Sequence, residues 1–229
     1  MPRRRAEWLI GRLTAKSVLV AALEEALPGD WPLDALEIAN DPRGVPYARI
    51  APEAGQVFGF WPGERLPLSV SISHTEGLAL CAATRAGPAG DGSRRALGID
   101  LGAVEPRSHE FVETFFTEDE QRFVRDAPPR ERALHVNLIW CAKEAVLKAL
   151  GLGLTVDTFG VSCRPEPGLA DPAEWPIAPA DGAWRPFFAT CGPALVAGGG
   201  TIRGIWRSLP GFVGALASTR GGGAVATAR

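Results

Sequence analysis

The chain lacks the sequence features that mark membrane-spanning, secreted and polyanion-coating proteins. None of its 229 residues belongs to an apolar run of about 18, the length that a membrane-spanning helix needs. The basic start, MPRRRAEWLIGRL, is not a secretory signal, because Gly11 and Arg12 interrupt its apolar stretch. A formal net charge of −2 argues against a protein that coats nucleic acid or an anionic membrane. We therefore expect neither as a partner.

Paired cysteines are also missing. The chain has four cysteines, and they form neither a CxxC motif nor the Cys/His spacing of a zinc site. They are Cys81, Cys141, Cys163 and Cys191. We expect reduced, buried thiols of an intracellular protein, and hence a cytoplasmic location.

The remaining composition is that of an ordinary globular protein, with 46% hydrophobic and 22% charged residues. Apolar periodicity predicts both helices and strands along the chain. The predicted helices cover 6–27, 108–116, 117–125 and the segment from 138 to Gly151 and Gly153. The first is predicted to be amphipathic, because its apolar residues lie near a 3.6-residue period: Trp8, Leu9, Leu13, Leu19, Val20, Leu23 and Leu27. The predicted strands cover 36–38, 68–72, 78–84, 97–101, 154–163, 185–191, 201–206 and 212–218. Turns or loops are expected at 52–67, 73–77, 85–95 and 164–182, and a frayed tail at 221–229.

The most informative segment is the helix that begins near residue 138. Trp140, Glu144 and Lys148 are spaced i, i+4, i+8 and therefore share one side of that helix. A carboxylate and an ammonium one turn apart have two explanations. They form either an exposed ion pair, worth about 0.3–0.5 kcal/mol, or a catalytic face that holds a metal and a phosphate.

Three motifs in a fixed order favour the second explanation. They are Ser73-His74-Thr75, then Gly98-Ile99-Asp100, then WCAKEAVLK at 140–148. Together they resemble the 4′-phosphopantetheinyl transferase superfamily, in its surfactin-type branch. The last motif is long and specific, whereas the first two are weak when taken singly.

The resemblance implies an α+β fold, a pseudodimer of two similar α/β halves with the ligand between them. The halves would span residues 1–104 and 105–229, and the second would carry the WCAKEAVLK helix. A weak internal repeat agrees with this fold, because each half is predicted to contain a helix, then strands and a late hairpin. A monomer is expected by the same resemblance.

The implied reaction moves 4′-phosphopantetheine from coenzyme A to a serine of an apo acyl or peptidyl carrier protein and releases adenosine 3′,5′-bisphosphate. Magnesium or manganese would be held by Asp100 and Glu144 and would offset the charge on the pyrophosphate. Lys148 would contact a phosphate or protonate the leaving oxygen. Glu144, Glu120 or a metal-bound water would accept the serine proton. The expected catalytic residues are thus Glu144, Lys148 and Glu120.

Contacts with coenzyme A are expected from a further set of polar side chains: Ser73, His74, Lys143, Lys148, Arg43 and Arg12. Several of these residues have a structural explanation as well. His74 fits a turn histidine that bonds backbone carbonyls, Lys143 a surface charge, and Arg12 a solvated helix face. Glu120 fits a capping box with Thr117.

The chain departs from the family pattern at two positions. Val45 stands where a G-K-P motif has lysine, and Gly102 stands where a D-x-E motif has its second acid. These departures favour an alternative, a non-catalytic module that binds coenzyme A or a carrier protein. The retained Asp100, Glu144 and Lys148 argue against it. An unrelated α+β binding protein would need the WCAKEAVLK match to be a coincidence.

Overall fold

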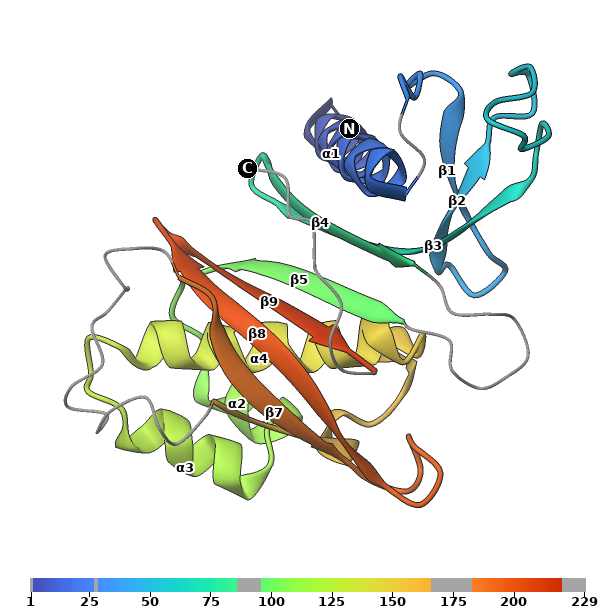
Figure 1. Ribbon diagram of the computed structural model, residues 1–229. Coiled ribbons are helices and arrows are strands. Elements are labelled where there is room, and N and C mark those ends of the chain that lie inside the picture. Colours follow the sequence, from blue (N-terminus) through green and yellow to red (C-terminus); the bar gives the residue numbers. More distant parts are fainter. Residues whose placement is uncertain (1, 27–28, 86–95, 166–182, 220–229) are drawn as a thin grey trace.

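The computed structural model describes residues 2–26, 29–85, 96–165 and 183–219, and its elements form four layers (Figure 1). Helix α1 covers the outer face of one β-sheet. A second β-sheet packs against the inner face of the first, and α2, α3 and α4 cover its far side. Most of the predicted turn at 85–95, most of the loop at 164–182 and the tail at 221–229 lie outside the described residues.

The helices and strands alternate in blocks along the chain. The α-helices are α1 (Pro2–Ala26), α2 (His109–Phe115), α3 (Glu118–Asp126) and α4 (Arg132–Ala149), and two short 3₁₀ helices are η1 (Gly153–Thr155) and η2 (Thr158–Gly160). The strands are β1 (Leu36–Asn40), β2 (Pro46–Ile50), β3 (Arg65–Thr75), β4 (Leu78–Arg85), β5 (Leu97–Ala103), β6 (Val161–Pro165), β7 (Arg185–Cys191), β8 (Gly200–Leu209) and β9 (Phe212–Ser218).

Both sheets are antiparallel. The first has the order β1-β2-β3-β4 and the second the order β5-β9-β8-β7-β6. The α+β class is therefore confirmed. In each sheet four consecutive strands follow a long helix, α1 or α4, which agrees with two similar halves, although the pseudodimer stays a prediction. The division after residue 104 also stays a prediction; β5, which precedes it, pairs with β9, which follows it.

Helix α1 packs on the first sheet through a narrow apolar stripe. Its buried side chains include Val18, Leu19 and Leu23, whereas Leu9 and Leu13 are 49% and 60% exposed. The sequence groups Leu9 and Leu13 with the buried Leu19 on one apolar face, and that prediction is wrong for both. At 100° per residue they lie on the side of the helix opposite Val18.

The sequence placed several element ends incorrectly. Strand β3 continues through His74 and Thr75, which pair with Ala79 and Leu78 of β4. The turn consists only of Glu76 and Gly77, both with positive φ, as in tight hairpins. The strand predicted from 154 begins at residue 161, because η1 and η2 occupy the preceding residues.

Helix termini agree better with the sequence. The predicted capping box at the start of α3 is present, with Thr117 and Glu120 bonding each other's backbone N–H. Helix α4 ends at Ala149, just before the expected stop at Gly151, whose φ of 69° is left-handed. Leu152 N–H donates to Leu147 O at 3.0 Å, which closes a Schellman motif.

The prediction of buried, unpaired thiols is confirmed, since all four cysteines are described and each is buried and free of disulfides. Among the described helices, none is both long and apolar enough to cross a membrane.

His135 lies in the core of the second half, stacked on the ring of Phe123 at 4.7 Å. Burial lowers the pKa of His135 from 6.5 to about 4. Between pH 6.5 and 4 the His135 imidazole is therefore protonated in the unfolded chain but stays neutral in the folded chain. We expect the free energy of unfolding to fall by up to about 3 kcal/mol across that window. Urea titrations at stepped pH would measure this loss.

The variant His135→Gln should flatten that pH dependence, because an amide does not titrate. His109, which is 86% exposed beside Glu113, provides the control, and His109→Gln should keep the slope of the parent. An unchanged slope in His135→Gln would contradict the assignment.

Candidate active site

The site is built where β5 crosses α4, and Gly98 permits the close approach. A Cβ on Gly98 would lie 2.0 Å from Ala145 O and 2.4 Å from Ala149 N, so any side chain would push the helix away from the strand. Two residues further along β5, Asp100 faces the helix side that carries Glu144 and Lys148. The glycine of the Gly98-Ile99-Asp100 motif thus sets the separation between the predicted acidic residues.

Asp100 is mostly buried and has partners from two directions. Its Oδ1 accepts hydrogen bonds from Ser73 Oγ at 2.8 Å and from Lys148 Nζ at 2.6 Å. Lys148 also donates to the Ile99 carbonyl oxygen at 3.1 Å. The predicted helix face is therefore neither an exposed surface nor a simple intrahelical pair, because its lysine reaches across to β5.

Glu144 completes the group, and its charge is poorly compensated. Burial first, and then the negative charge of Asp100, raise the pKa of Glu144, while Lys148 opposes the shift. Its Oε1 is buried and has no hydrogen-bond partner within the described part of the chain. Two carboxylates and one ammonium therefore share a partly desolvated space.

This arrangement fits a hard divalent cation. A buried carboxylate oxygen without a donor, close to a second carboxylate, is the donor set that magnesium or manganese prefers. Among the described residues no cluster of three or more His, Cys, Asp or Glu side chains is arranged to hold a metal. Asp100 and Glu144 would thus supply two ligands, and water and phosphate oxygens the others.

The thiol of Cys141 fills the space beside Gly102. A Cβ on Gly102 would lie 2.8 Å from Cys141 Sγ. The thiol lies against the Val213 carbonyl oxygen, at 3.7 Å, and against the Asp100 carboxylate. Burial first, and then the Asp100 charge, raise the pKa of Cys141 well above its usual range, so the thiol stays protonated. A second acid at residue 102 would have to displace this thiol.

We expect Gly102→Ala to lower the free energy of unfolding by about 1–3 kcal/mol, the usual cost of overpacking a filled core. Adding Cys141→Ala should recover much of that loss, because it removes the Sγ atom that the new methyl group meets. Chemical denaturation of the two single variants and the double variant would measure the coupling. Strictly additive effects would contradict the contact.

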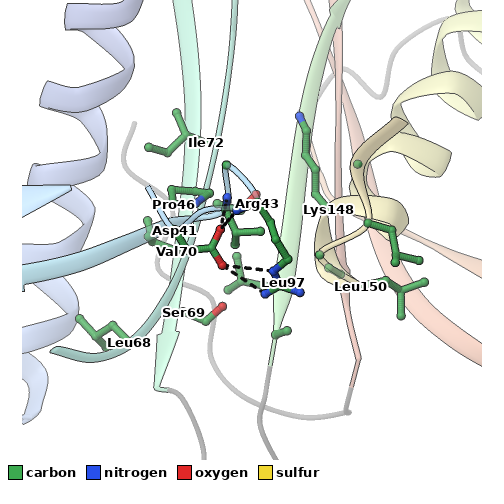
Figure 2. Close-up of a pocket in the computed structure, with 18 of the residues that line it drawn as sticks. Asp41, Arg43, Pro46, Leu68, Ser69, Val70, Ile72, Leu97, Lys148 and Leu150 are labelled. Carbon is green, nitrogen blue, oxygen red and sulfur yellow. Dashed lines mark hydrogen bonds and ion pairs between the residues drawn. The ribbon is translucent and has the colours of Figure 1, made fainter. Parts of the chain in front are cut away.

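A cleft of about 480 Å³ opens at the Lys148 end of the site. Four parts of the chain line it: the turn at 41–46, strand β3 within 65–72, the start of β5 at 96–97, and the end of α4 with the residues that follow it, within 148–155. Figure 2 shows Lys148 and Leu150 on one side, and Leu68, Ser69 and Val70 on the other. The cleft thus lies between the first sheet and the last turn of α4.

Two further cations line this cleft. Arg43 is held by Asp41, with 3.2 Å between Nη2 and Oδ2, and Arg65 stacks over Tyr47 at 4.5 Å. Val45 lines the cleft as well, so the position of the missing lysine faces this space. Arg43, expected from the sequence, is therefore at the cleft. Arg65 was not expected, because it lies in a segment predicted to be a loop.

His74 lies against α1 and Arg12 belongs to that helix, and both are separate from the Asp100 group. A Cβ on Gly11 would lie 3.2 Å from the His74 ring, which places that ring against the helix. Arg12 donates to the Ile38 carbonyl oxygen at 2.8 Å and to Asn40 Oδ1 at 3.0 Å. Neither residue lines the cleft. Their role as coenzyme A contacts stays a prediction.

Glu120 and Lys143 form a buried ion pair on another side of α4. Their side chains are 1% and 0% exposed, with 2.5 Å between Lys143 Nζ and Glu120 Oε2. Lys143 also donates to Val161 O at 2.7 Å, and Glu120 Oε1 accepts from Cys163 N at 2.7 Å. The structure therefore brings these two residues together, but separately from Asp100, Glu144 and Lys148.

Trp140, the third residue of the predicted helix face, contacts the rings of Phe111 and Phe115 at 5.0 and 5.1 Å. It anchors α2 to α4 as a packing residue, at the end of the face away from the cleft.

Comparisons with known proteins agree with the motifs. Residues 96–185 match the model of the ACPS family, described as the 4′-phosphopantetheinyl transferase superfamily. The matched segment contains Asp100, Glu144 and Lys148. The match supports assignment to that superfamily and leaves the branch open. A search of curated proteins finds no match.

A search of solved structures gives a distant similarity. One match is the crystal structure of Thermotoga maritima holo-[acyl-carrier-protein] synthase, with 19% identity and a TM-score of 0.35. The alignment covers 54% of this chain and 61% of that one, so this chain spans about three fifths of the synthase's length. A similarity this distant carries no argument about activity or substrate.

Proposed function

We propose that this protein transfers the 4′-phosphopantetheine arm of coenzyme A to a serine of an apo acyl or peptidyl carrier protein. The observation that carries the proposal is the group formed by Asp100, Glu144 and Lys148 at the edge of a cleft lined by Arg43 and Arg65. The superfamily match over residues 96–185, which contain Asp100, Glu144 and Lys148, supports it. We further propose a monomeric, cytoplasmic enzyme of the surfactin-type branch.

Coenzyme A would occupy the cleft with its phosphates toward the cations. Arg43 and Arg65 stand on the first-sheet side and Lys148 on the α4 side, so anionic groups would be held from both walls. Arg43 and Arg65 would thereby supply the positive charge that Val45 does not. The pyrophosphate would then lie near Lys148 and the two carboxylates.

The reaction is a displacement at phosphorus. The carrier serine oxygen forms a bond to the β-phosphorus of coenzyme A, and the bond from that phosphorus to the bridging oxygen breaks. Adenosine 3′,5′-bisphosphate leaves, and the serine proton must pass to a base. A divalent cation held by Asp100 and Glu144 would stabilise the negative charge that builds up on the phosphate oxygens. Lys148 would neutralise or protonate the leaving oxygen.

Glu144 is better placed than Glu120 to receive the serine proton. Its Oε1 has no competing donor among the described residues, so this oxygen is free to take either the cation or the serine proton. Both oxygens of Glu120 already accept hydrogen bonds, from Thr117, Cys163 and Lys143. We therefore propose that Glu120 and Lys143 position α3, α4 and β6 and contact neither substrate.

Intact-mass spectrometry of an apo carrier protein tests the proposal directly. After incubation with this protein, coenzyme A and magnesium, the carrier should gain the mass of one phosphopantetheine arm. A chelator should abolish the gain, and added manganese or magnesium should restore it. No gain on acyl and peptidyl carrier proteins alike would refute the transferase.

A non-catalytic module that binds coenzyme A or a carrier protein is the alternative. The observation that favours it is Cys141 Sγ, which occupies the space where a third acid would enter from residue 102. Calorimetry separates the two functions. If coenzyme A binds and keeps its pyrophosphate intact, and no carrier is modified, the protein is a non-catalytic binding module.

A further inference from the structure

Two serine hydroxyls of β3 join the first sheet to the second. β5 is an edge strand, so backbone N–H groups on one of its sides have no partner within the sheet. Ser71 Oγ accepts from Ile99 N at 3.0 Å, and Ser73 Oγ accepts from Leu101 N at 3.1 Å. Both serines are buried. They therefore satisfy donors that would otherwise be buried without a partner.

Ser73 makes one contact that Ser71 does not. Because its oxygen accepts from Leu101 N–H, its single proton is available to donate, and it points to Asp100 Oδ1 at 2.8 Å. Ser71 lies opposite Ile99, whose side chain is apolar. The two residues thus share one backbone contact and differ in the contact with the carboxylate.

Asp100 Oδ1 is consequently held by both halves of the molecule. Ser73 approaches from the first sheet, and Lys148 approaches from α4 at 2.6 Å. Two charge-assisted hydrogen bonds to one oxygen restrict the rotation of the carboxyl group. That restriction fixes how Asp100 stands relative to Glu144.

We propose that Ser73 is a positioning residue for Asp100, and that its proton serves this carboxylate and not a phosphate of the substrate. Ser73 would orient Asp100 for a divalent cation shared with Glu144, whereas Ser71, which bonds Ile99 N and lines the cleft, would leave this carboxylate unaffected. The proposal rests on the proposed function in one respect, the cation held by Asp100 and Glu144. It also explains how a strand of the first sheet contributes to a site on the second.

Mn²⁺ binding to the protein alone provides a test that needs no substrate. Electron paramagnetic resonance measures the loss of the free Mn²⁺ signal on titration, for the parent and for Ser71→Ala, Ser73→Ala and Ser73→Thr. Ser71→Ala and Ser73→Ala should lower Tm by similar amounts, because each loses one bond to β5. Only Ser73→Ala should weaken Mn²⁺ binding, by about tenfold or more. Ser73→Thr, which keeps the hydroxyl, should restore it.

Transfer kinetics give a second comparison. Ser73→Ala should lower kcat with the KM for coenzyme A unchanged, because it disturbs the carboxylate and not the cleft. Equal losses of Mn²⁺ affinity in the two alanine variants would overturn the proposal, as would a parent protein that takes up no Mn²⁺. A raised KM with normal Mn²⁺ affinity would make Ser73 a substrate contact instead. A parent that binds Mn²⁺ but modifies no carrier would refute the transferase and leave the test of Ser73 intact.

Discussion

Replacing Lys143 with methionine is expected to lower the free energy of unfolding by about 3–5 kcal/mol, although the residue belongs to the WCAKEAVLK motif. Its ammonium is fully buried against Glu120 and the Val161 carbonyl oxygen. Removing it leaves Glu120 as an uncompensated charge in the core. Urea denaturation followed by circular dichroism would measure the loss.

An exposed ion pair on α3, the helix that carries Glu120, provides the matched control for Lys143. Arg122 bonds Asp119 at 3.0 Å on the surface of α3, so Arg122→Met should change stability by about 1 kcal/mol at most. The double variant Lys143→Met/Glu120→Leu should recover part of the loss, because no buried charge then remains. A Lys143→Met protein that keeps its stability but loses transfer would show that the pair acts in the chemistry.

The elements that the sequence predicted well are those whose signals are local. The capping box of Thr117 and Glu120 and the glycine stop at Gly151 depend on residues within one helical turn, and both are present. Leu9 and Leu13 were misplaced because apolar residues lay on more than one side of α1, and periodicity alone did not identify the face that meets the sheet. The pairing of β5 with β9 joins residues more than a hundred positions apart and has no local signal.

The site was predictable where a motif fixed it. The order of the three motifs predicted that Asp100, Glu144 and Lys148 belong to one site, and the structure brings all three together. Ser71 and Arg65 carry no such signal, since they reach the joint and the cleft only through the placement of β3. The Cys141 thiol beside Gly102 is likewise a contact between β5 and α4, which only the packed structure brings together.

The different surroundings of Lys143 and Glu144 also depend on packing between elements that are distant in the sequence. The two are adjacent in sequence, yet consecutive helical residues point about 100° apart, so one faces Glu120 and the other Asp100. Spacing along α4 indicated which residues share a side, but not what each side meets. Lys143 therefore remained open between a phosphate contact and a surface charge, and the structure gives it a buried ion pair.

Glu144→Gln is expected to reduce transfer to the carrier protein by about 10²–10⁴-fold, the usual contribution of a positioned acid–base group. The amide has nearly the same shape, but it neither accepts a proton nor binds a cation as a carboxylate does. Single-turnover transfer followed by intact-mass spectrometry would measure the rate, and Mn²⁺ titration would show the accompanying loss of affinity.

Stability should respond in the opposite direction, which separates this variant from one that merely unfolds. Because the pKa of Glu144 is raised, its ionised form weakens the fold at any pH above that pKa, and the uncharged amide removes that cost. Glu144→Gln should thus unfold at the same or a higher urea concentration at neutral pH. The exposed Glu113 on α2 supplies the control, since Glu113→Gln should keep both activity and stability. Undiminished transfer by Glu144→Gln would exclude Glu144 both as cation ligand and as base, and with it the site described at the crossing of β5 and α4.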